Sequence, residues 1–183
     1  MTTFLIVIVI VAVLAGAALV VGRPLLRRQR LRRRFGPEYD RALGQFATRR
    51  DAERNLAERE RMFRDLDIRE LPDAEKDKYE NAWSALQERF VESPSDALAE
   101  ADVLITRVMH DRGYPTGARE KRMEILSVRY GHSIDRYRQA QEIERLREAG
   151  KASTEDLRQA MLHHRTLFTD LLGRAPVPVA RGK

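Results

Sequence analysis

Residues 73–113 read DAEKDKYENAWSALQERFVESPSDALAEADVLITRVMHDRG, and this stretch decides the fold class. Its first half carries an aromatic-rich stripe at the spacing i, i+4, i+7 and i+11: Tyr79, Trp83, Leu86 and Phe90. Because this spacing places the four side chains on one face of a helix, it predicts a helix over about 73–92 with that face in the core. An aromatic ligand-binding box is the alternative interpretation.

The second half of this stretch begins with a helix start signal. Ser93 is placed to cap a helix, Pro94 suits its first position, and Asp96 completes a capping-box pattern. Apolar residues then recur on one face: Leu98, Ala101, Leu104, Ile105 and Val108. Gly113 marks the expected C-terminal end of this helix.

The rest of the sequence repeats this kind of pattern, with no alternating β-branched run and no Asn-Gly turn. We expect further helices over about 38–66, 119–129, 133–150 and 153–173. The chain is therefore predicted to be all-α, with a bundle of about five or six helices over residues 35–173. The tail, residues 174–183, has two prolines and no core pattern, so we expect it to be disordered.

An apolar run, FLIVIVIVAVLAGAALVVG, occupies residues 4–22 and contains no charged or polar side chain. A helix of this length spans roughly 28 Å, close to the ~30 Å hydrocarbon core of a bilayer. We therefore predict a transmembrane anchor over residues 1–22. A cleaved signal peptide competes with this interpretation, because Ala15-Gly16-Ala17 has the form of a cleavage site. A signal peptide, however, carries its positive charge before the apolar run, and here the charge follows it.

A basic stem, residues 23–34, follows this run and contains no acidic residue. Its seven arginines are Arg23, Arg27, Arg28, Arg30, Arg32, Arg33 and Arg34. Because Lys and Arg accumulate on the cytoplasmic side of a membrane span, the stem predicts a single-pass protein of the cell membrane with a cytoplasmic helical domain. We expect these arginines to face an anionic inner leaflet. A purely topogenic role is the simpler alternative.

The net charge of +6 does not indicate a nucleic-acid-binding domain, because the excess positive charge lies in the stem and not in the helical domain. The stem holds seven of the 34 basic residues, so the remaining 27 are opposed by all 28 acidic residues. A nearly neutral surface with interspersed signs is typical of an ordinary soluble domain, whereas nucleic-acid-binding domains carry a basic patch on their own fold.

The sequence offers no motif for catalysis, metal binding or cofactor binding. It contains no cysteine, which excludes thiolate catalysis and Cys-ligated metal sites. His163 and His164 are adjacent, so on a helix they point about 100° apart and cannot bind one ion in the i, i+4 manner. We expect the histidines at helix surfaces or boundaries. No nucleophile elbow, Walker A loop or dinucleotide-binding glycine motif occurs, so we predict no catalytic residue, no metal, no cofactor and no enzyme.

One polar cluster, Glu38-Tyr39-Asp40, follows the stem. Gly36 can serve as an N-cap there and Pro37 as the first helical residue. Acidic side chains in a first turn complement the helix dipole. The alternative is a docking surface near the membrane.

Residues 34–41, RFGPEYDR, placed after a single span, and residues 155–161, EDLRQAM, are similar to a family of small bacterial membrane-anchored proteins of unknown function. The resemblance covers most of the chain in the order span, basic stem, helical domain. It implies no activity and no functional residues.

These features favour an interaction or scaffold module held at the inner leaflet, where its helical domain docks an unidentified protein partner. An enzyme with an unrecognised helical active site is one alternative. A nucleic-acid tether built on the arginine stem is another. We expect no specific nucleic acid and no small molecule as a partner.

Overall fold

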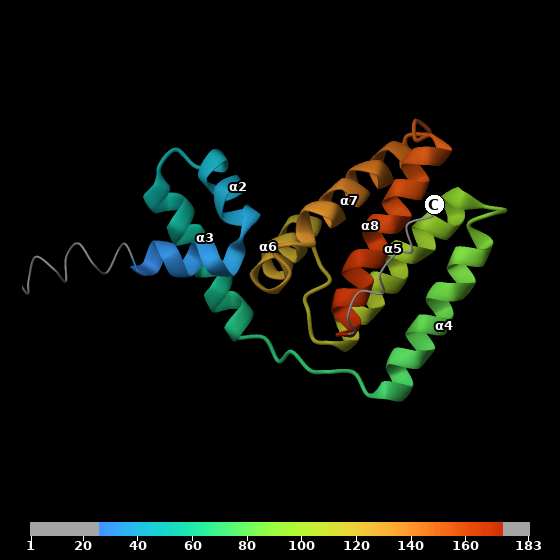
Figure 1. The fold of residues 1–183 in the computed structure, drawn as a ribbon, viewed down its shortest axis with the longest axis horizontal. Helices are drawn as coiled ribbons and strands as arrows, with labels where there is room; N and C mark the ends of the chain where they lie inside the picture. Colours follow the sequence, from blue (N-terminus) through green and yellow to red (C-terminus); the bar gives the residue numbers. More distant parts are fainter. Residues whose placement is uncertain (1–25, 174–183) are drawn as a thin grey trace, which may run out of the picture. The chain divides into compact units, whose positions relative to one another are not determined.

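The computed structural model describes residues 26–173, and throughout this range the regular structure is helical, with no strand. Residues 26–35 form a helix, followed by α2 (Pro37–Gln45), α3 (Arg49–Arg64), α4 (Asp73–Arg89), α5 (Pro94–Asp111), α6 (Arg119–Arg129), α7 (Ile134–Glu148) and α8 (Thr154–Leu172). The predicted all-α fold is confirmed (Figure 1). The expected anchor and the expected disordered tail lie outside the described residues.

No helix within residues 26–173 is both long enough and apolar enough to cross a membrane. The contacts divide the chain into two compact units, residues 1–57 and residues 58–183, with the boundary inside α3. We expected a single helical domain over 35–173. We call the first unit the N-terminal unit and the second the bundle.

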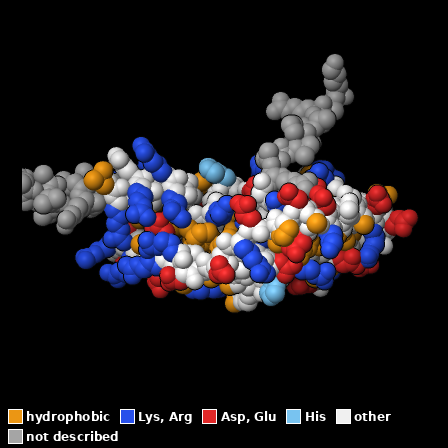
Figure 2. All heavy atoms as spheres, turned by 90° about the horizontal axis from the view of Figure 1, so that it is seen from below, with side chains coloured by type: hydrophobic (Ala, Val, Ile, Leu, Met, Phe, Trp, Pro, Cys, Tyr) orange, Lys and Arg blue, Asp and Glu red, His pale blue; other side chains and the backbone are white. Residues whose placement is uncertain are grey.

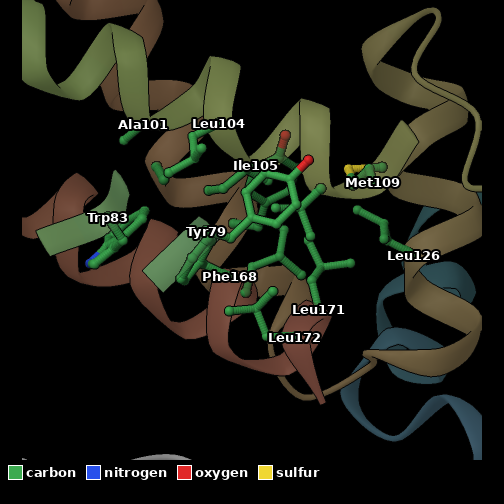
Figure 3. Close-up of a cluster of buried hydrophobic side chains, with 14 of the residues drawn as sticks. Tyr79, Trp83, Ala101, Leu104, Ile105, Met109, Leu126, Phe168, Leu171 and Leu172 are labelled. Carbon is green, nitrogen blue, oxygen red and sulfur yellow. The ribbon is translucent and has the colours of Figure 1, made fainter. Parts of the chain in front are cut away.

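The bundle is built around α8, which contacts α7 on one side and α5 on the other. α4 packs against α5, and α6 contacts α7 (Figure 1). The buried side chains between these helices include Ile105, Leu126, Leu167 and Leu171, each no more than 1 % exposed. Figure 3 shows part of this cluster, in which side chains of α4, α5 and α8 converge.

The aromatic stripe of α4 belongs to this core, as the spacing predicted. Tyr79, Trp83 and Leu86 are buried, and the half-buried Phe90 packs against the cluster. Trp83 stacks on Phe168 of α8, with ring centroids 4.7 Å apart. Such a pair adds about 0.5–1.5 kcal/mol beyond the burial of its area. The stripe therefore ties α4 to α8.

Two of the cap predictions are confirmed in full at α8. Ser153 forms the capping box with Asp156, and the helix ends at Gly173, which has a φ of 71°. At α5 the helix begins at Pro94 as predicted, but the Ser93 side chain makes no capping hydrogen bond. The sequence pattern therefore predicted the start of α5 correctly, but the predicted capping hydrogen bond to the Ser93 side chain is absent.

The long helix expected over residues 38–66 is wrong, because the chain breaks between α2 and α3. Phe46 is extended, with φ −114° and ψ 147°, and ends α2. Thr48 then caps α3: its Oγ1 accepts a hydrogen bond from the backbone N–H of Asp51 at 3.2 Å. This Thr-x-x-Asp pattern is a helix start signal inside the segment that was expected to be one helix. As a result, residues 37–172 contain seven helices, where about five or six were expected.

The turn after α5 depends on Gly113. Its φ is +83°, and a Cβ atom added there would lie 2.2 Å from the carbonyl oxygen of Asp67. Arg69 and Arg112 hold the same two segments together, because the Arg69 N–H donates to the Arg112 carbonyl and the Arg112 Nε donates to the Arg69 carbonyl, both at 3.1 Å. Glycine is required here for both backbone conformation and space.

Candidate functional site

The described part of the basic stem belongs to a helix over residues 26–35. Leu31 and Phe35, one turn apart, are 2 % and 0 % exposed and form the buried face. Five arginines are exposed: Arg27, Arg30, Arg32, Arg33 and Arg34. Arg28 is half-buried, and Arg23 lies outside the described residues. Because two apolar side chains fix the helix, the arginines are presented as a group on a folded surface.

A shallow hollow of about 440 Å³ lies on this basic face, lined by Leu26, Gln29, Arg30, Arg33 and Arg34. Figure 2 shows Lys and Arg side chains gathered over the N-terminal unit. Leu26 is 68 % exposed beside them. An exposed apolar side chain next to several cations is the composition that binds at a membrane interface.

The cluster Glu38-Tyr39-Asp40 starts α2, but only Asp40 is exposed. Glu38 and Tyr39 are each 1 % exposed, and the Tyr39 hydroxyl donates to Glu53 Oε1 at 2.8 Å. Burial and the nearby Glu53 carboxylate raise the pKa of Tyr39. Tyr39 therefore joins α2 to α3, and a docking surface at this cluster would have only Asp40 available.

A second candidate surface is the groove between α4 and α5 in the bundle. It encloses about 540 Å³ and is lined by Ala82, Ala85, Leu86, Arg89, Glu100, Val103, Leu104 and Arg107. A further hollow of about 350 Å³ shares Ala82, Leu104 and Arg107 with it and extends to Tyr79 and Asp111. The two hollows therefore form one groove along the outer face of the α4–α5 pair. We call it the α4–α5 groove.

Charged side chains flank the apolar floor of this groove. Arg89 donates to both oxygens of Glu100, with Nη1–Oε distances of 2.9 and 2.8 Å. At the other end, the Tyr79 hydroxyl donates to Asp111 Oδ2 at 2.5 Å. Burial and this hydrogen bond raise the pKa of Tyr79, and the same hydrogen bond lowers the pKa of Asp111. Arg107 lies between these pairs and is exposed.

The groove was not predicted from the sequence, because small and charged residues at helical spacing are also typical of an ordinary solvent-exposed helix face. A signal was present in α4, since Glu75, Lys78, Ala82, Ala85 and Arg89 recur at i, i+3, i+7, i+10 and i+14. Two alanines at the centre of such a stripe mark a place where another helix can approach closely.

His164 corrects the expectation that the histidines lie at helix surfaces or boundaries. Its side chain is 0 % exposed and meets the Tyr137 ring edge-on, with centroids 5.7 Å apart. Neither ring nitrogen has a hydrogen-bond partner among the described residues. Burial lowers the pKa of His164 to about 4, so the imidazole is neutral at pH 7.

Asp102, near His164, is hydrogen-bonded to other side chains of the bundle. Asp102 of α5 accepts hydrogen bonds from the Gln141 side chain and, at 3.4 Å, from the Tyr137 hydroxyl. Burial, followed by the Asp102 charge, raises the pKa of Tyr137. His163 is half-buried, so the two adjacent histidines occupy different environments. No group of three or more potential ligands among residues 26–173 is arranged to hold a metal ion.

No protein-family model matches this chain, and comparisons with curated proteins and with solved structures give no match. The resemblance to a family of small membrane-anchored proteins therefore stays a prediction. The function is argued below from the residues and their geometry.

Proposed function

We propose that this protein is a membrane-anchored helical interaction module. In this arrangement residues 1–22 cross the membrane, the arginine stem lies on the cytoplasmic leaflet, and the bundle offers the α4–α5 groove to a protein partner. The observation that carries the proposal is the helix over residues 26–35, which buries Leu31 and Phe35 and exposes five arginines.

The physical argument for the stem is electrostatic. Each Lys or Arg close to an anionic leaflet contributes about 1 kcal/mol, and this contribution falls off within a Debye length. A folded helix keeps its arginines together beside the apolar run, whereas a flexible linker would spread them. The five exposed arginines therefore support both the orientation of the span and a contact with anionic lipid.

The argument for an interaction role rests on the groove. Val103 of α5 lines the groove and is 58 % exposed. On the α4 side, Ala82 and Ala85 line it with short side chains that leave room for a partner. An apolar floor between charged edges is the usual composition of a surface that receives a helix.

Membrane topology is the test of this function. The chain has no native cysteine, so a single S84C substitution gives one reactive thiol on the exposed face of α4. In intact cells a membrane-impermeant maleimide should fail to label S84C and should label it fully after lysis. Labelling of intact cells would overturn the proposed orientation.

The lipid contact is tested with the full chain in vesicles. Replacing Arg27, Arg30 and Arg33 by Gln should reduce the protection of the stem from proteinase K, which does not require arginine at its cleavage site, in vesicles that contain anionic lipid. It should have no effect in vesicles of neutral lipid. A matched triple Gln variant of exposed arginines in the bundle (Arg129, Arg136 and Arg145) controls for total charge. Equal protection in both kinds of vesicle would contradict the lipid contact, and steep salt-dependent binding of RNA or DNA would favour a nucleic-acid tether instead.

A further inference from the structure

The exposed face of α5 has a charge pattern that is antisymmetric about its centre. Val103 is 58 % exposed at the middle of this face. Two exposed acidic residues, Asp96 and Glu100, precede it, and the exposed Arg107 and an exposed histidine, His110, follow it, so the opposed charges nearest the centre are Glu100 and Arg107. The spacings of three or four residues place all five side chains on one side of the helix. We call this set the α5 stripe.

From this pattern we propose that the α5 stripe binds the α5 stripe of a second copy of this chain, antiparallel and related by a two-fold axis near Val103. This inference names the partner of the interaction module proposed above. A two-fold axis through the centre of a helix places each residue before the centre opposite one that follows it in the partner. Glu100 of one copy then faces Arg107 of the other, and the same contact recurs on the opposite side of the axis.

The charges around the groove support this pairing. Among the residues that the structure describes, Arg107 forms no ion pair within its own chain. Glu100 is already held by Arg89, which fixes its carboxylate in the groove with a side-chain exposure of 47 %. A second cation from a partner helix can share that carboxylate. A parallel arrangement would instead place Glu100 beside Glu100 and Arg107 beside Arg107, so the charges specify the antiparallel orientation.

The shape of the groove supports the same occupant. The walls beside Val103 are formed by Ala82 and Ala85 of α4, whose short side chains let a second helix approach the α4–α5 pair. The 18 residues of α5 give a contact roughly 27 Å long. With Val103 as the main exposed apolar side chain, the dimer is weak in solution. Confinement to a membrane raises the effective concentration of the copies and favours pairing there.

Cysteine cross-linking in native membranes tests the proposal, because the full chain contains no other thiol. A V103C variant places two cysteines beside the two-fold axis, where a short bismaleimide should join the copies into a dimer. S84C, on another face of α4, serves as the matched control and should give little dimer. A V103C protein that stays monomeric would overturn the proposal and leave the groove to a helix of another protein.

Charge exchange then tests the specific contact. In the V103C background, R107E places a second carboxylate opposite Glu100, and E100R places a second guanidinium opposite Arg107. Each single variant should therefore cross-link about tenfold less. When the two variants are co-expressed with different tags, both contacts become attractive again and mixed dimers should form well above the level of either single variant. The double variant E100R/R107E should likewise recover its dimer.

R136E, on the exposed surface of α7, makes the same change of charge elsewhere and should cross-link like the parent. Circular dichroism of each variant separates loss of the contact from loss of the fold. Unchanged cross-linking of R107E, or failure of the mixed pair to recover, would overturn the pairing. Neither result would bear on the topology experiment, which tests the anchor alone.

Discussion

The Gly113 Cα lies so close to Asp67 that a Cβ atom added to it would meet the Asp67 carbonyl oxygen at 2.2 Å. The contact joins the end of α5 to the segment that leads into α4. Gly113 also has a φ of +83°, a conformation that L side chains rarely adopt. The turn therefore cannot accept a side chain without moving backbone.

Gly113→Ala should destabilise the bundle by about 2–4 kcal/mol, because it combines backbone strain with a clash against a backbone carbonyl. Urea unfolding of the full chain in detergent, followed by circular dichroism, measures the change. The matched control is Gly117→Ala, where nothing lies within 4 Å of the new Cβ and φ is not in the left-handed range. The control should be neutral or slightly stabilising, and equal effects of the two substitutions would contradict this account.

The stability of the bundle should fall as the pH drops, and His164 should account for much of the fall. Burial lowers the pKa of His164 from 6.5 to about 4, so the unfolded chain binds a proton at this site more readily than the folded chain. The neutral His164 therefore makes its full contribution to the free energy of unfolding above about pH 6.5. As the pH falls toward 4, about 3 kcal/mol of this stability is lost progressively.

His164→Leu should remove that part of the pH dependence and leave the protein at least as stable at pH 7. Unfolding free energies measured between pH 4 and pH 7.5 for the wild type and the variant give the difference. His132→Asn, at an exposed histidine, should retain the wild-type profile. A His164→Leu profile that still follows the wild type would show that His164 does not titrate on unfolding.

The two serine caps should respond differently to the same substitution. Ser153→Ala removes a capping box whose Oγ accepts from the Asp156 N–H at 3.1 Å, and should cost about 1 kcal/mol. Ser93→Ala removes no capping hydrogen bond and should cost only a few tenths of a kcal/mol. Thermal unfolding of the two variants side by side checks the difference. If Ser93→Ala proved as costly as Ser153→Ala, the cap at α5 would have to form in solution.

Trp83 is the only tryptophan of the chain and stacks on Phe168, so its fluorescence reports on the contact between α4 and α8. Phe168→Leu should cost about 1–2 kcal/mol, because it replaces a 3 % exposed ring with a smaller side chain and loses the stack. It should also change the emission of Trp83 in the folded state. Leu162→Ala, at a side chain of α8 that is 43 % exposed, should change neither quantity appreciably.

The predictions from sequence succeeded where the determining signal was local. The aromatic spacing of α4 and the capping box of α8 are set by residues within a few turns of each other, and both occur in the structure as predicted. The break at 46–48 was missed although its signal, Thr48 with Asp51, was equally local. The break was not recognised because the segment is highly charged and its apolar residues are irregularly spaced.

The candidate sites could be predicted only in part, because exposure depends on distant segments. The arginines of the stem are visible in the sequence, but their presentation depends on the burial of Leu31 and Phe35 in the N-terminal unit. The motif-like cluster at residues 38–40 proved largely buried, with Tyr39 bonded to Glu53, fourteen residues away.

By itself the sequence determined the helical class, most helix ends and the separation of a basic stem from a nearly neutral domain, since periodicity, caps and charge act over a few residues. Only the tertiary structure decided which faces of these helices are covered. His164 is sealed by α5 and α7, whereas the α5 stripe and the α4–α5 groove stay open because α4 covers just one side of α5. Burial of this kind depends on packing between segments far apart in the chain, and no local pattern specifies it.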